Sequence, residues 1–438
     1  MNVLVFGHDS STHAVAWKLI NSAAVNEVIV APGNAGTTFF ASSTALAADD
    51  HHAVASFVLN ESIDLVVADA AGIASGLPDE IGTLSIAVCG SSRAVQQLHT
   101  SRCAAREWLQ QHNLPTPRSR ICTSRAHAEK YAATVATPLT IIADRADGPA
   151  FRCADHAAAQ RAIAACFDDG SNGVIVEAWV AGPTVTTSLL TDGHVGIPVP
   201  PVRLWTADQL GYAAINGAHS AATPLWQRLD AHLQRVIRQP LLAALEQSGS
   251  GVRGWIGATC VLGQHGPLIQ TLHLVPSPFE LAATLPRLQS DLLPLLLGSA
   301  RGTLGQIEQP RWSDQATVSV GLLQHTGIAI GSDALQHAVG SFQPGMITFQ
   351  HAPAAVLSNP YVPLAERYGK AKTSLGYRSV SSVAAHTLAV ATTDDPLLAI
   401  VTATAPDLAT ARERVYTDLQ RSSLPTTLYR AEVGSREV

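Results

Sequence analysis

The residues best suited to chemistry begin where the first apolar segment of the chain ends. Gly7 closes the run VLVFG, and the polar turn HDSST at 8–12 leads into a segment with helical spacing. A glycine turn that opens a helix can hold a phosphate, because its backbone N–H groups point at the anion. Asp9 would repel a phosphate, however, and Ser10 or Ser11 would serve as a helix cap. We therefore interpret this turn mainly as a corner of the fold.

Other residue patterns that carry out familiar reactions are absent from the sequence. The histidine pairs His8–His13 and His265–His273 lack a third ligand at the spacing of zinc sites. No GxSxG motif marks a serine nucleophile, and no CxxC pair marks a redox or metal site. Scattered cysteines are typical of reduced thiols in the cytoplasm. The chain has six of them, at Cys89, Cys103, Cys122, Cys153, Cys166 and Cys260.

Composition and charge exclude several classes of protein. The chain is 47% apolar and 14% charged, and Asp, Gly or Pro interrupts every apolar stretch before about 18 residues, so no transmembrane helix is predicted. The first residues enter a strand pattern without the basic and apolar regions of a signal peptide. The net charge is −6 and Lys and Arg form no cluster, which disfavours a nucleic-acid partner. We expect a cytoplasmic protein that binds neither membranes nor nucleic acids.

The elements around the first turn follow an α/β pattern. At 438 residues the chain should form about three domains. Residues 1–100 alternate short apolar runs (VLVFG, EVIVA, IDLVVAD and LSIAVCG) with helical segments, which predicts a doubly wound parallel sheet. Ligands bind such sheets at the carboxyl ends of the strands, where the first turn lies. The helical segment CAAREWLQQHN stops at LPTP, where the prolines mark the entry to a new unit.

The remaining chain predicts two further α/β units. Residues 101–313 carry apolar runs such as PLTIIAD, GVIVEAWV, GWIGATCVLG and PLIQTLHLV, and TVTTSLLTDGHVGI predicts a hairpin with its turn at Asp192-Gly193. Residues 314–438 carry ATVSVGLLQ, GMITFQ, LAVAT and LLAIVTAT, followed by a helix in LATARERVYTDLQ. We therefore expect an α/β protein in which an α+β unit lies between two α/β units.

Several short motifs, taken in order, resemble those of the phosphoribosylamine–glycine ligase family, also called glycinamide ribonucleotide synthetase. They are APGNAGT at 31–37, the junction at 88–117, GVIVEAWVAG at 173–182 and YRAEVG at 429–434. Members of this family have the ATP-grasp fold. With ATP and magnesium they activate glycine as an acyl phosphate, which the amine of phosphoribosylamine captures.

The resemblance implies a specific domain order and a specific set of binding residues. Residues 1–100 would form the pre-ATP-grasp domain, 101–313 a degenerate ATP-grasp domain, and 314–438 the C-terminal domain. Gly7 and His13, with Pro32, Gly33, Asn34 and Gly36, would be what is left of a phosphoribosyl site. Arg102 and Glu177 would be what is left of a nucleotide site. A turn kept for its geometry explains the Pro-Gly-Asn segment equally well.

The residues that such a protein uses to hold ATP are largely replaced in this chain. Ser101-Arg102 stands where the family has one triphosphate lysine, and Ile142 stands where it has another. The glycine-rich loop that follows is shortened to RADGPAF, and its Asp147 and Pro149 are unsuited to covering phosphates. An arginine could still contact a phosphate, whereas an isoleucine offers no charge.

The magnesium ligands are replaced as well. Magnesium needs oxygen ligands, usually carboxylates, and the alignment puts Thr271 and His273 at the two ligand positions. No Asp or Glu occurs between Gln264 and Glu280, so Glu280 is the remaining and weaker candidate.

These replacements lead to three hypotheses about function. In the leading one the chain is a non-catalytic relative without a cofactor, which binds a complete ligase, another purine-pathway enzyme or a small phosphorylated metabolite. In the second it is a divergent but active ligase that uses ATP and magnesium through Arg102, Glu177 and Glu280. In the third, His219 or Asp144 acts as the acid or base of a different reaction.

Overall fold

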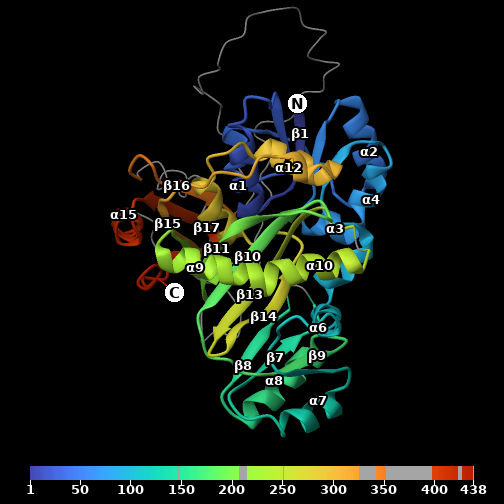
Figure 1. Ribbon diagram of the computed structural model, residues 1–438, viewed down its shortest axis with the longest axis vertical. Helices are drawn as coiled ribbons and strands as arrows, with labels where there is room; N and C mark the ends of the chain where they lie inside the picture. The colour runs from blue at the N-terminus through green and yellow to red at the C-terminus, as the bar shows by residue number, and fades with distance from the viewer. Residues whose placement is uncertain are drawn as a thin grey trace, which may run out of the picture.

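The structure is a computed structural model of the 438-residue chain (Figure 1). It describes residues 1–145, 148–206, 215–249, 251–324, 342–351, 397–422 and 427–437. The apolar run LAVAT and Asp147, both singled out in the sequence, lie outside the described residues.

The N-terminal region forms the doubly wound parallel sheet that the sequence predicts. Its strand order is β3-β2-β1-β4-β5, and all pairs are parallel. Apolar side chains on both faces of the central strands β1 and β4 are buried, as a parallel sheet covered by helices requires. The strands are β1 (Asn2–Gly7), β2 (Glu27–Pro32), β3 (Ser42–Ser43), β4 (Leu65–Val67) and β5 (Ala87–Cys89), and the main helices are α1 (Ser10–Leu19), α2 (His51–Asn60), α3 (Ala70–Ser75), α4 (Leu77–Gly82) and α5 (Gln96–Thr100).

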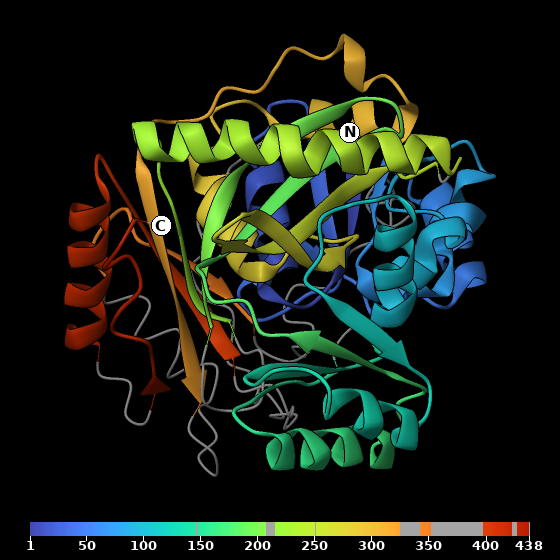
Figure 2. The same cartoon turned by 60° about the horizontal axis from the view of Figure 1, so that its bottom comes forward.

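A smaller module follows α6 (Arg102–Gln111) and forms the lower part of the molecule in Figure 1. Its four antiparallel strands lie in the order β6-β9-β7-β8. Two helices pack on this sheet, and Figure 2 shows both on the same face. The strands are β6 (Ser119–Cys122), β7 (Leu139–Ala143), β8 (Ala150–Cys153) and β9 (Val174–Ala178), and the helices are α7 (Arg125–Ala132) and α8 (His156–Asp168).

A nine-stranded sheet joins the central and C-terminal regions. Its order is β14-β13-β10-β11-β12-β15-β17-β16, and β18 pairs with β15. The strands are β10 (Thr184–Thr191), β11 (Gly196–Thr206), β12 (Ile215–Ser220), β13 (Gly254–Gly263), β14 (Gly266–His273), β15 (Ala316–Gln324), β16 (Ile347–Gln350), β17 (Leu397–Ala405) and β18 (Thr427–Leu428). Because β12 pairs with β15, the sheet continues across the expected boundary near residue 313, and that boundary remains a prediction.

Helices cover this large sheet. A long helix of three parts, α9 (Pro224–Leu233), the π-helical segment η3 (Gln234–Arg238) and α10 (Gln239–Gln247), crosses the upper part of Figure 2. The short helix α11 (Pro278–Thr284) lies between α1 and the strands β11, β12, β15 and β17. The other helices are α12 (Leu292–Arg301) and α15 (Leu408–Arg421). No helix in the described ranges has the length and apolar character needed to cross a bilayer.

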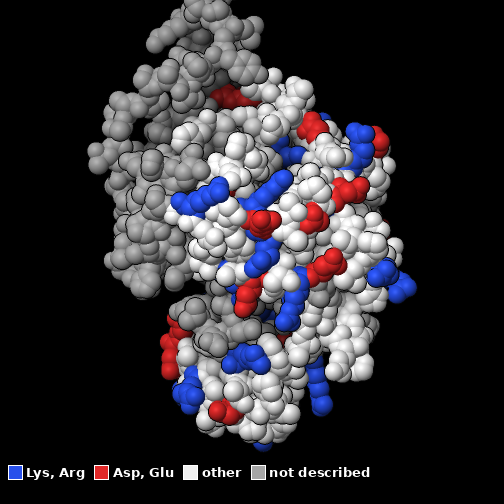
Figure 3. All heavy atoms as spheres, turned by 90° about the vertical axis from the view of Figure 1, so that its left-hand side faces the viewer, with Lys and Arg blue, Asp and Glu red and all other residues white. Residues whose placement is uncertain are grey.

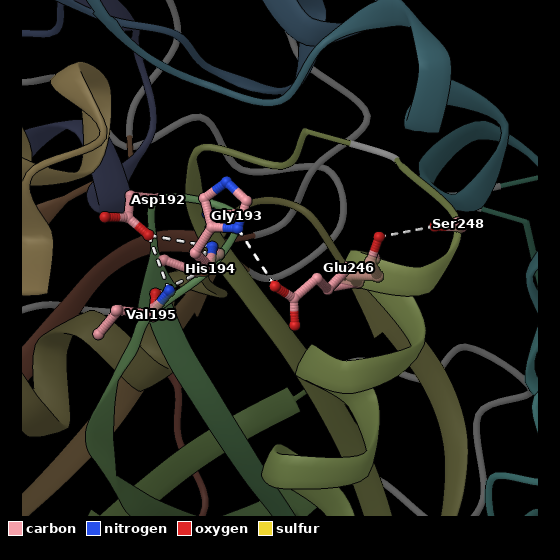
Figure 4. A network of polar contacts seen from close by, with 8 residues as sticks. Asp192, Gly193, His194, Val195, Glu246 and Ser248 are labelled. Atoms are coloured by element: carbon pink, nitrogen blue, oxygen red, sulfur yellow. Dashed lines mark hydrogen bonds and ion pairs between the residues drawn. The ribbon is translucent and has the colours of Figure 1, made fainter.

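The hairpin between β10 and β11 confirms the predicted turn (Figure 4). Gly193 has φ +98°, a conformation that favours glycine. Asp192 holds the turn, because its Oδ1 accepts hydrogen bonds from the backbone N–H groups of His194 at 3.1 Å and Val195 at 2.8 Å. Its Oδ2 accepts the N–H of Leu304 at 2.9 Å and so ties the hairpin to the segment after α12.

Candidate functional site

A cavity of about 530 Å³ lies at the carboxyl ends of the parallel strands. It is lined by the segments that follow β1, β4 and β5 and, from the central region, by Gly254-Trp255 and by residues 273–278 at the end of β14 and after it. This is where ligands bind to doubly wound sheets. The volume is within the range of small-molecule sites.

The first turn lines this cavity, and its helix cap differs from the expected one. Asp9, rather than Ser10 or Ser11, is the N-cap of α1, so that prediction was wrong. Its Oδ1 accepts the Thr12 N–H at 2.9 Å and the Ser11 hydroxyl at 2.5 Å. A carboxylate therefore occupies the helix N-terminus at which a phosphate would be bound.

Gly7 enables the sharp turn before this cap. It has φ +118°, and a Cβ added to it would lie 2.1 Å from Oγ1 of Thr12. The residue is required for the close approach of strand β1 to helix α1. It also lines the cavity, as the phosphoribosyl hypothesis needs.

Asp69 provides a second carboxylate at the same edge of the sheet. It is the N-cap of α3, and its Oδ1 accepts the Gly72 N–H at 2.8 Å. Burial and the nearby charge of Asp9 raise the pKa of Asp69, whereas the Gly72 N–H and His8 oppose the rise. Asp69 was not predicted as a site residue, although its place directly after the apolar run IDLVVA was the available signal.

The second turn, at residues 32–36, connects parts of the fold. Asn34 is fully buried, and its Nδ2 donates to the carbonyls of His8 at 2.8 Å and Gln350 at 2.9 Å. Its Oδ1 accepts the N–H groups of Gly36 at 2.9 Å and Thr37 at 3.1 Å. The Asn34 side chain thus joins the first turn to strand β16.

His13 packs behind this turn. It lies between Phe40 and Phe349, and burial lowers its pKa to about 4. A Cβ on Gly36 would lie 2.4 Å from its ring, so a glycine is needed there. Of the six residues named as a phosphoribosyl site, Gly7 lines the cavity, and the other five (His13, Pro32, Gly33, Asn34 and Gly36) are not among its lining residues.

The position expected to hold a triphosphate lysine is apolar. Ile142 at the end of β7 is 5% exposed and packs with Cys103 and Ile175. Beside it, Asp144 accepts the Ser101 hydroxyl at 2.6 Å and the Cys103 N–H at 2.9 Å, at the N-terminus of α6. A third carboxylate, after those of Asp9 and Asp69, therefore lies at a helix N-terminus, where Asp144 accepts a backbone N–H of α6 beside the N-cap residue Ser101.

Arg102 and Glu177 do not form one site. Arg102 lines a separate cavity of about 100 Å³, which shares His99 and His273 with the larger one. Glu177 on β9 is 2% exposed and forms an ion pair with Arg106 at 2.6 Å. Arg106 also donates to the Ser119 hydroxyl and the Gln270 carbonyl, so the pair ties the small module to β14.

Neither of the two positions that the resemblance assigns to magnesium ligands, Thr271 and His273, carries a carboxylate. His273 contacts the Thr259 hydroxyl at 2.6 Å, and burial lowers its pKa to about 4. Thr271, its neighbour along β14, lines the smaller cavity. Within the described ranges, no three His, Cys, Asp or Glu side chains gather closely enough to hold a metal ion. At the two positions that the resemblance assigns to magnesium ligands, the side chains are therefore a threonine and a histidine and not the carboxylates that magnesium usually takes.

Glu280 is buried in the interior of the protein. It is 1% exposed on α11, and among the described residues neither carboxylate oxygen accepts a hydrogen bond of normal geometry, although Ser188 and the Ser277 backbone lie close enough to favour its charged form. Burial raises its pKa to about 7, and the nearby Ser188 and Ser277 limit the rise. Glu280 is not among the residues that line either cavity.

His219, the candidate acid or base of a different reaction, is fully buried in strand β12. Its Nδ1 accepts the Trp205 indole N–H at 2.9 Å, and its Nε2 lies 2.7 Å from the Glu437 carbonyl. Both ring nitrogens are therefore occupied by structural contacts.

The comparisons with known proteins agree with the resemblance. "Phosphoribosylglycinamide synthetase, N domain" matches residues 1–99, and "Phosphoribosylglycinamide synthetase, ATP-grasp (A) domain" matches residues 100–273. A phosphoribosylamine–glycine ligase of Allochromatium vinosum is 30% identical over 322 residues, covering 70% of this chain and 75% of that protein. The one of Streptomyces coelicolor is 27% identical over 443 residues, covering 100% of this chain and 99% of that protein.

Solved structures share the fold. A phosphoribosylamine–glycine ligase of Thermotoga maritima covers 99% of this chain and 100% of its own, with a TM-score of 0.72 and 14% identity. The biotin carboxylase domain of the Hydrogenobacter thermophilus 2-oxoglutarate carboxylase, which was solved with MgADP, has a TM-score of 0.63 and 12% identity. It covers 98% of this chain and 92% of its own.

Proposed function

Because this chain belongs to the phosphoribosylglycinamide synthetase family, we propose that it is a member that keeps the fold without ATP-dependent ligation and acts by binding. The observation that carries the proposal is the chemistry around the expected ATP site. An apolar side chain, Ile142, and a capping carboxylate, Asp144, lie where positive charge would be needed to neutralise a triphosphate.

Electrostatics explains why these differences matter for catalysis. Groups that stabilise developing charge in the transition state usually supply the largest catalytic contribution, about 10²–10³-fold in rate for one hydrogen-bond donor. Here the two positions aligned with magnesium ligands are Thr271 and His273, and burial keeps His273 neutral at ordinary pH. Several such contributions would be missing together.

A second candidate function is a divergent, active phosphoribosylamine–glycine ligase. It is favoured by the match to the Streptomyces coelicolor ligase over the whole chain and by the cavity at the carboxyl ends of β1 and β4. Such an enzyme would need ATP and magnesium, with a site rebuilt around residues such as Arg102.

Two further aspects belong to this proposal. The partner would be a complete ligase, another enzyme of purine biosynthesis or a small phosphorylated metabolite. A second, motif-complete ligase in the same genome would favour the first of these.

The compartment would be the cytoplasm, in agreement with six free and buried cysteines. Acidic and basic side chains alternate on the face in Figure 3, without one dominant sign among its described residues.

A thermal-shift titration with ATP and magnesium, together and separately, tests the proposal. A ligand at 100 times its dissociation constant stabilises a protein by about 2.7 kcal/mol, which is readily measured. We expect no magnesium-dependent shift at millimolar ATP and no glycine-dependent phosphate release with phosphoribosylamine. The Streptomyces coelicolor ligase, treated in parallel, serves as the positive control. A magnesium-dependent shift together with turnover at a rate like that of the control would establish the second candidate function.

A further inference from the structure

We propose that the face of the large sheet beside the C-terminal segment is a docking surface for an acidic segment of a partner protein, formed by Arg203, Arg430 and Arg436 around Trp205. We call these four residues the arginine surface. The inference rests on the proposed function and deepens it, because a protein that acts by binding needs a surface for its partner. It is carried by two guanidinium groups that lie over one indole ring and by an arginine without an acceptor in the described part of the chain.

The strand pattern brings Arg203 and Trp205 to one face of the large sheet. They are two residues apart on β11, so their side chains point to the same side. Leu204 between them points the other way and packs in the core that includes α11. On the face of Trp205, the strand partner is Gly217 of β12, and a Cβ added there would lie 2.3 Å from the Val433 side chain. The C-terminal segment therefore lies against the same face as Arg203.

Two arginines from distant parts of the chain lie over Trp205. Cζ of Arg203 is 4.4 Å from the centre of the indole ring, and Cζ of Arg430 is 5.6 Å from it. A guanidinium group within about 6 Å of a ring centre is attracted to the face of the ring. Stacking uses the flat face of the guanidinium group, whereas a carboxylate is bound by the N–H groups along its edge. Trp205 can therefore hold both side chains in place for a carboxylate ligand.

Arg203 has donors that the fold does not use. No described residue accepts a hydrogen bond from it, and its Nη1 is a buried atom without an acceptor. Burial lowers the pKa of Arg203, and the charge of the exposed Arg436 lowers it further. No carboxylate is among the groups that shift this pKa. A carboxylate from a partner would supply both the missing acceptor and the missing opposite charge.

Two acidic side chains lie near the arginine surface, and they leave it an excess of positive charge. Glu432 is 3.4 Å from Nη2 of Arg430, and its side chain is 67% exposed. Such an exposed pair contributes little to stability, so a partner's carboxylate can take the place of Glu432. Oε2 of Glu437 accepts the Thr223 hydroxyl at 3.3 Å, where the chain end lies beside the beginning of α9 (Figure 1). Three arginines thus face two acids, one of which is bound elsewhere.

The backbone that carries Arg430 is held in place before any partner binds. Its carbonyl accepts the Tyr416 hydroxyl, and the oxygen of this hydroxyl accepts the Val433 N–H at 3.1 Å. Cζ of Arg412 on α15 lies 5.0 Å from the centre of the Tyr416 ring, and its Nη2 donates to the Ala431 carbonyl at 3.0 Å. A surface fixed in this way loses little conformational entropy on binding.

The shape and composition of the arginine surface favour a protein segment over other anions. None of its residues lines the cavities of 530 and 100 Å³, whereas sites for small molecules are concave. Arg and Trp are enriched at the positions that dominate binding energy in protein interfaces. The net charge of −6 opposes the binding of a long polyanion such as a nucleic acid. The fitting occupant is a short run of Asp and Glu side chains on a partner protein.

Fluorescence polarisation with labelled hexapeptides tests the inference on the full chain. The probes are a peptide of alternating Asp and Glu, its counterpart of Asn and Gln, and a peptide of alternating Lys and Arg. At low ionic strength we expect the acidic peptide to bind at least about tenfold more tightly than the other two. Tripolyphosphate and a thymidine hexanucleotide serve as competitors. Absence of acidic-peptide binding, or displacement by either competitor at lower concentration than by the unlabelled acidic peptide, would overturn the inference.

Variants show whether the stacked arginines hold the peptide. Arg203→Gln and Arg430→Gln each remove one charge and should weaken binding about tenfold, the factor expected for one charge-assisted hydrogen bond. Arg203→Lys keeps the charge without the planar group and should weaken binding less. Arg152→Gln is the matched control, because Arg152 stacks on Trp179 at 4.3 Å in the small module and should change binding less than about twofold.

Melting temperatures measured in parallel identify a variant that fails to fold, and the remaining two variants then decide the assignment. Acidic-peptide binding that is unchanged in the folded variants at Arg203 and Arg430 would refute the docking surface. Binding that Arg152→Gln weakens equally would also refute it, because the effect would then follow net charge alone.

The outcomes separate this inference from the proposed function. Absence of both peptide binding and ligase turnover would refute the docking surface and leave the proposed function standing. Ligase turnover with ATP, together with peptide binding that Arg203→Gln weakens, would refute the proposed function alone, because the docking surface would then belong to an active enzyme.

Discussion

Replacing Glu280 by Gln should stabilise the protein at alkaline pH and have little effect in mild acid. The side chain is 1% exposed, and its carboxylate oxygens accept no hydrogen bond of normal geometry among the described residues, so the nearby Ser188 and Ser277 offset its burial only in part. A charge without a partner is costly in such a place, so the folded protein favours the neutral acid. Glutamine has nearly the same shape and is neutral at every pH, so the substitution removes the titration and preserves the packing.

The sign and size of the effect follow from the pKa of Glu280. Burial raises it from 4.5 to about 7, so the folded chain binds more protons than the unfolded chain between these values. The contribution of Glu280 to stability is therefore complete below about pH 4.5 and is lost as the pH rises through about 7. At 1.36 kcal/mol per pH unit, the loss between about pH 5 and about pH 8 amounts to roughly 2–3 kcal/mol.

Urea denaturation of the wild-type and Glu280→Gln proteins at both pH values measures this difference. We expect the free energy of unfolding of the variant, relative to wild type, to be roughly 2–3 kcal/mol larger at about pH 8 than at about pH 5. The exposed Glu107 on α6 provides the matched control, since Glu107→Gln should change stability equally at both pH values. A pH-independent difference for Glu280→Gln, or a variant less stable than wild type at about pH 8, would refute the burial argument.

Three other predictions concern the ion pair, the hairpin and the buried histidines. Glu177→Leu should lower the free energy of unfolding, measured by urea denaturation, by about 3–5 kcal/mol, because it leaves the buried Arg106 without its carboxylate. Adding Arg106→Leu should restore most of that loss. Asp192→Ala should lower the free energy of unfolding by about 1–3 kcal/mol, because three hydrogen bonds to the Asp192 carboxylate are lost. A melting temperature equal to that of wild type would contradict the idea that Asp192 stabilises the hairpin turn. His13 and His219 have pKa values lowered to about 4 by burial, so the unfolded chain binds more protons below about pH 6.5 and stability should fall as the pH drops from there toward 4. In urea denaturation, His219→Gln should reduce the fall in the free energy of unfolding between about pH 6.5 and pH 4. An unchanged pH dependence in this variant would contradict the assignment of the effect to His219.

The fold could be predicted from the sequence because its signals are local. The alternation of apolar runs with helical segments in residues 1–100 identified the parallel sheet, and Asp192-Gly193 identified a hairpin turn. The pairing of β12 with β15 had no such signal, because it joins strands distant in the sequence and makes one sheet of two predicted units.

The candidate site was less accessible to sequence reasoning, because capping and burial depend on tertiary contacts. Asp9 and Ser10 are both good N-cap residues, and the choice between them is made by the path of the chain after Gly7. The burial of His219 had no signal in the sequence, because nothing in its neighbours indicates that Trp205 and the C-terminal segment enclose it. The replacement of charged positions was visible in the sequence, whereas the fact that a capping acid lies beside Ile142 required the structure.

The continuity of the large sheet has a consequence for shortened versions of the protein. Strand β12 pairs with β15 from Gly217–Val320 to Ser220–Thr317, and Val433 of the C-terminal segment packs directly on Gly217. A fragment that ends near residue 313 would lose both contacts and expose the unpaired backbone groups of β12 at an open edge. Open edges of this kind recruit strands from other molecules. Such a fragment would therefore self-associate. In the full chain the C-terminal region prevents this, because β15 covers the edge of β12.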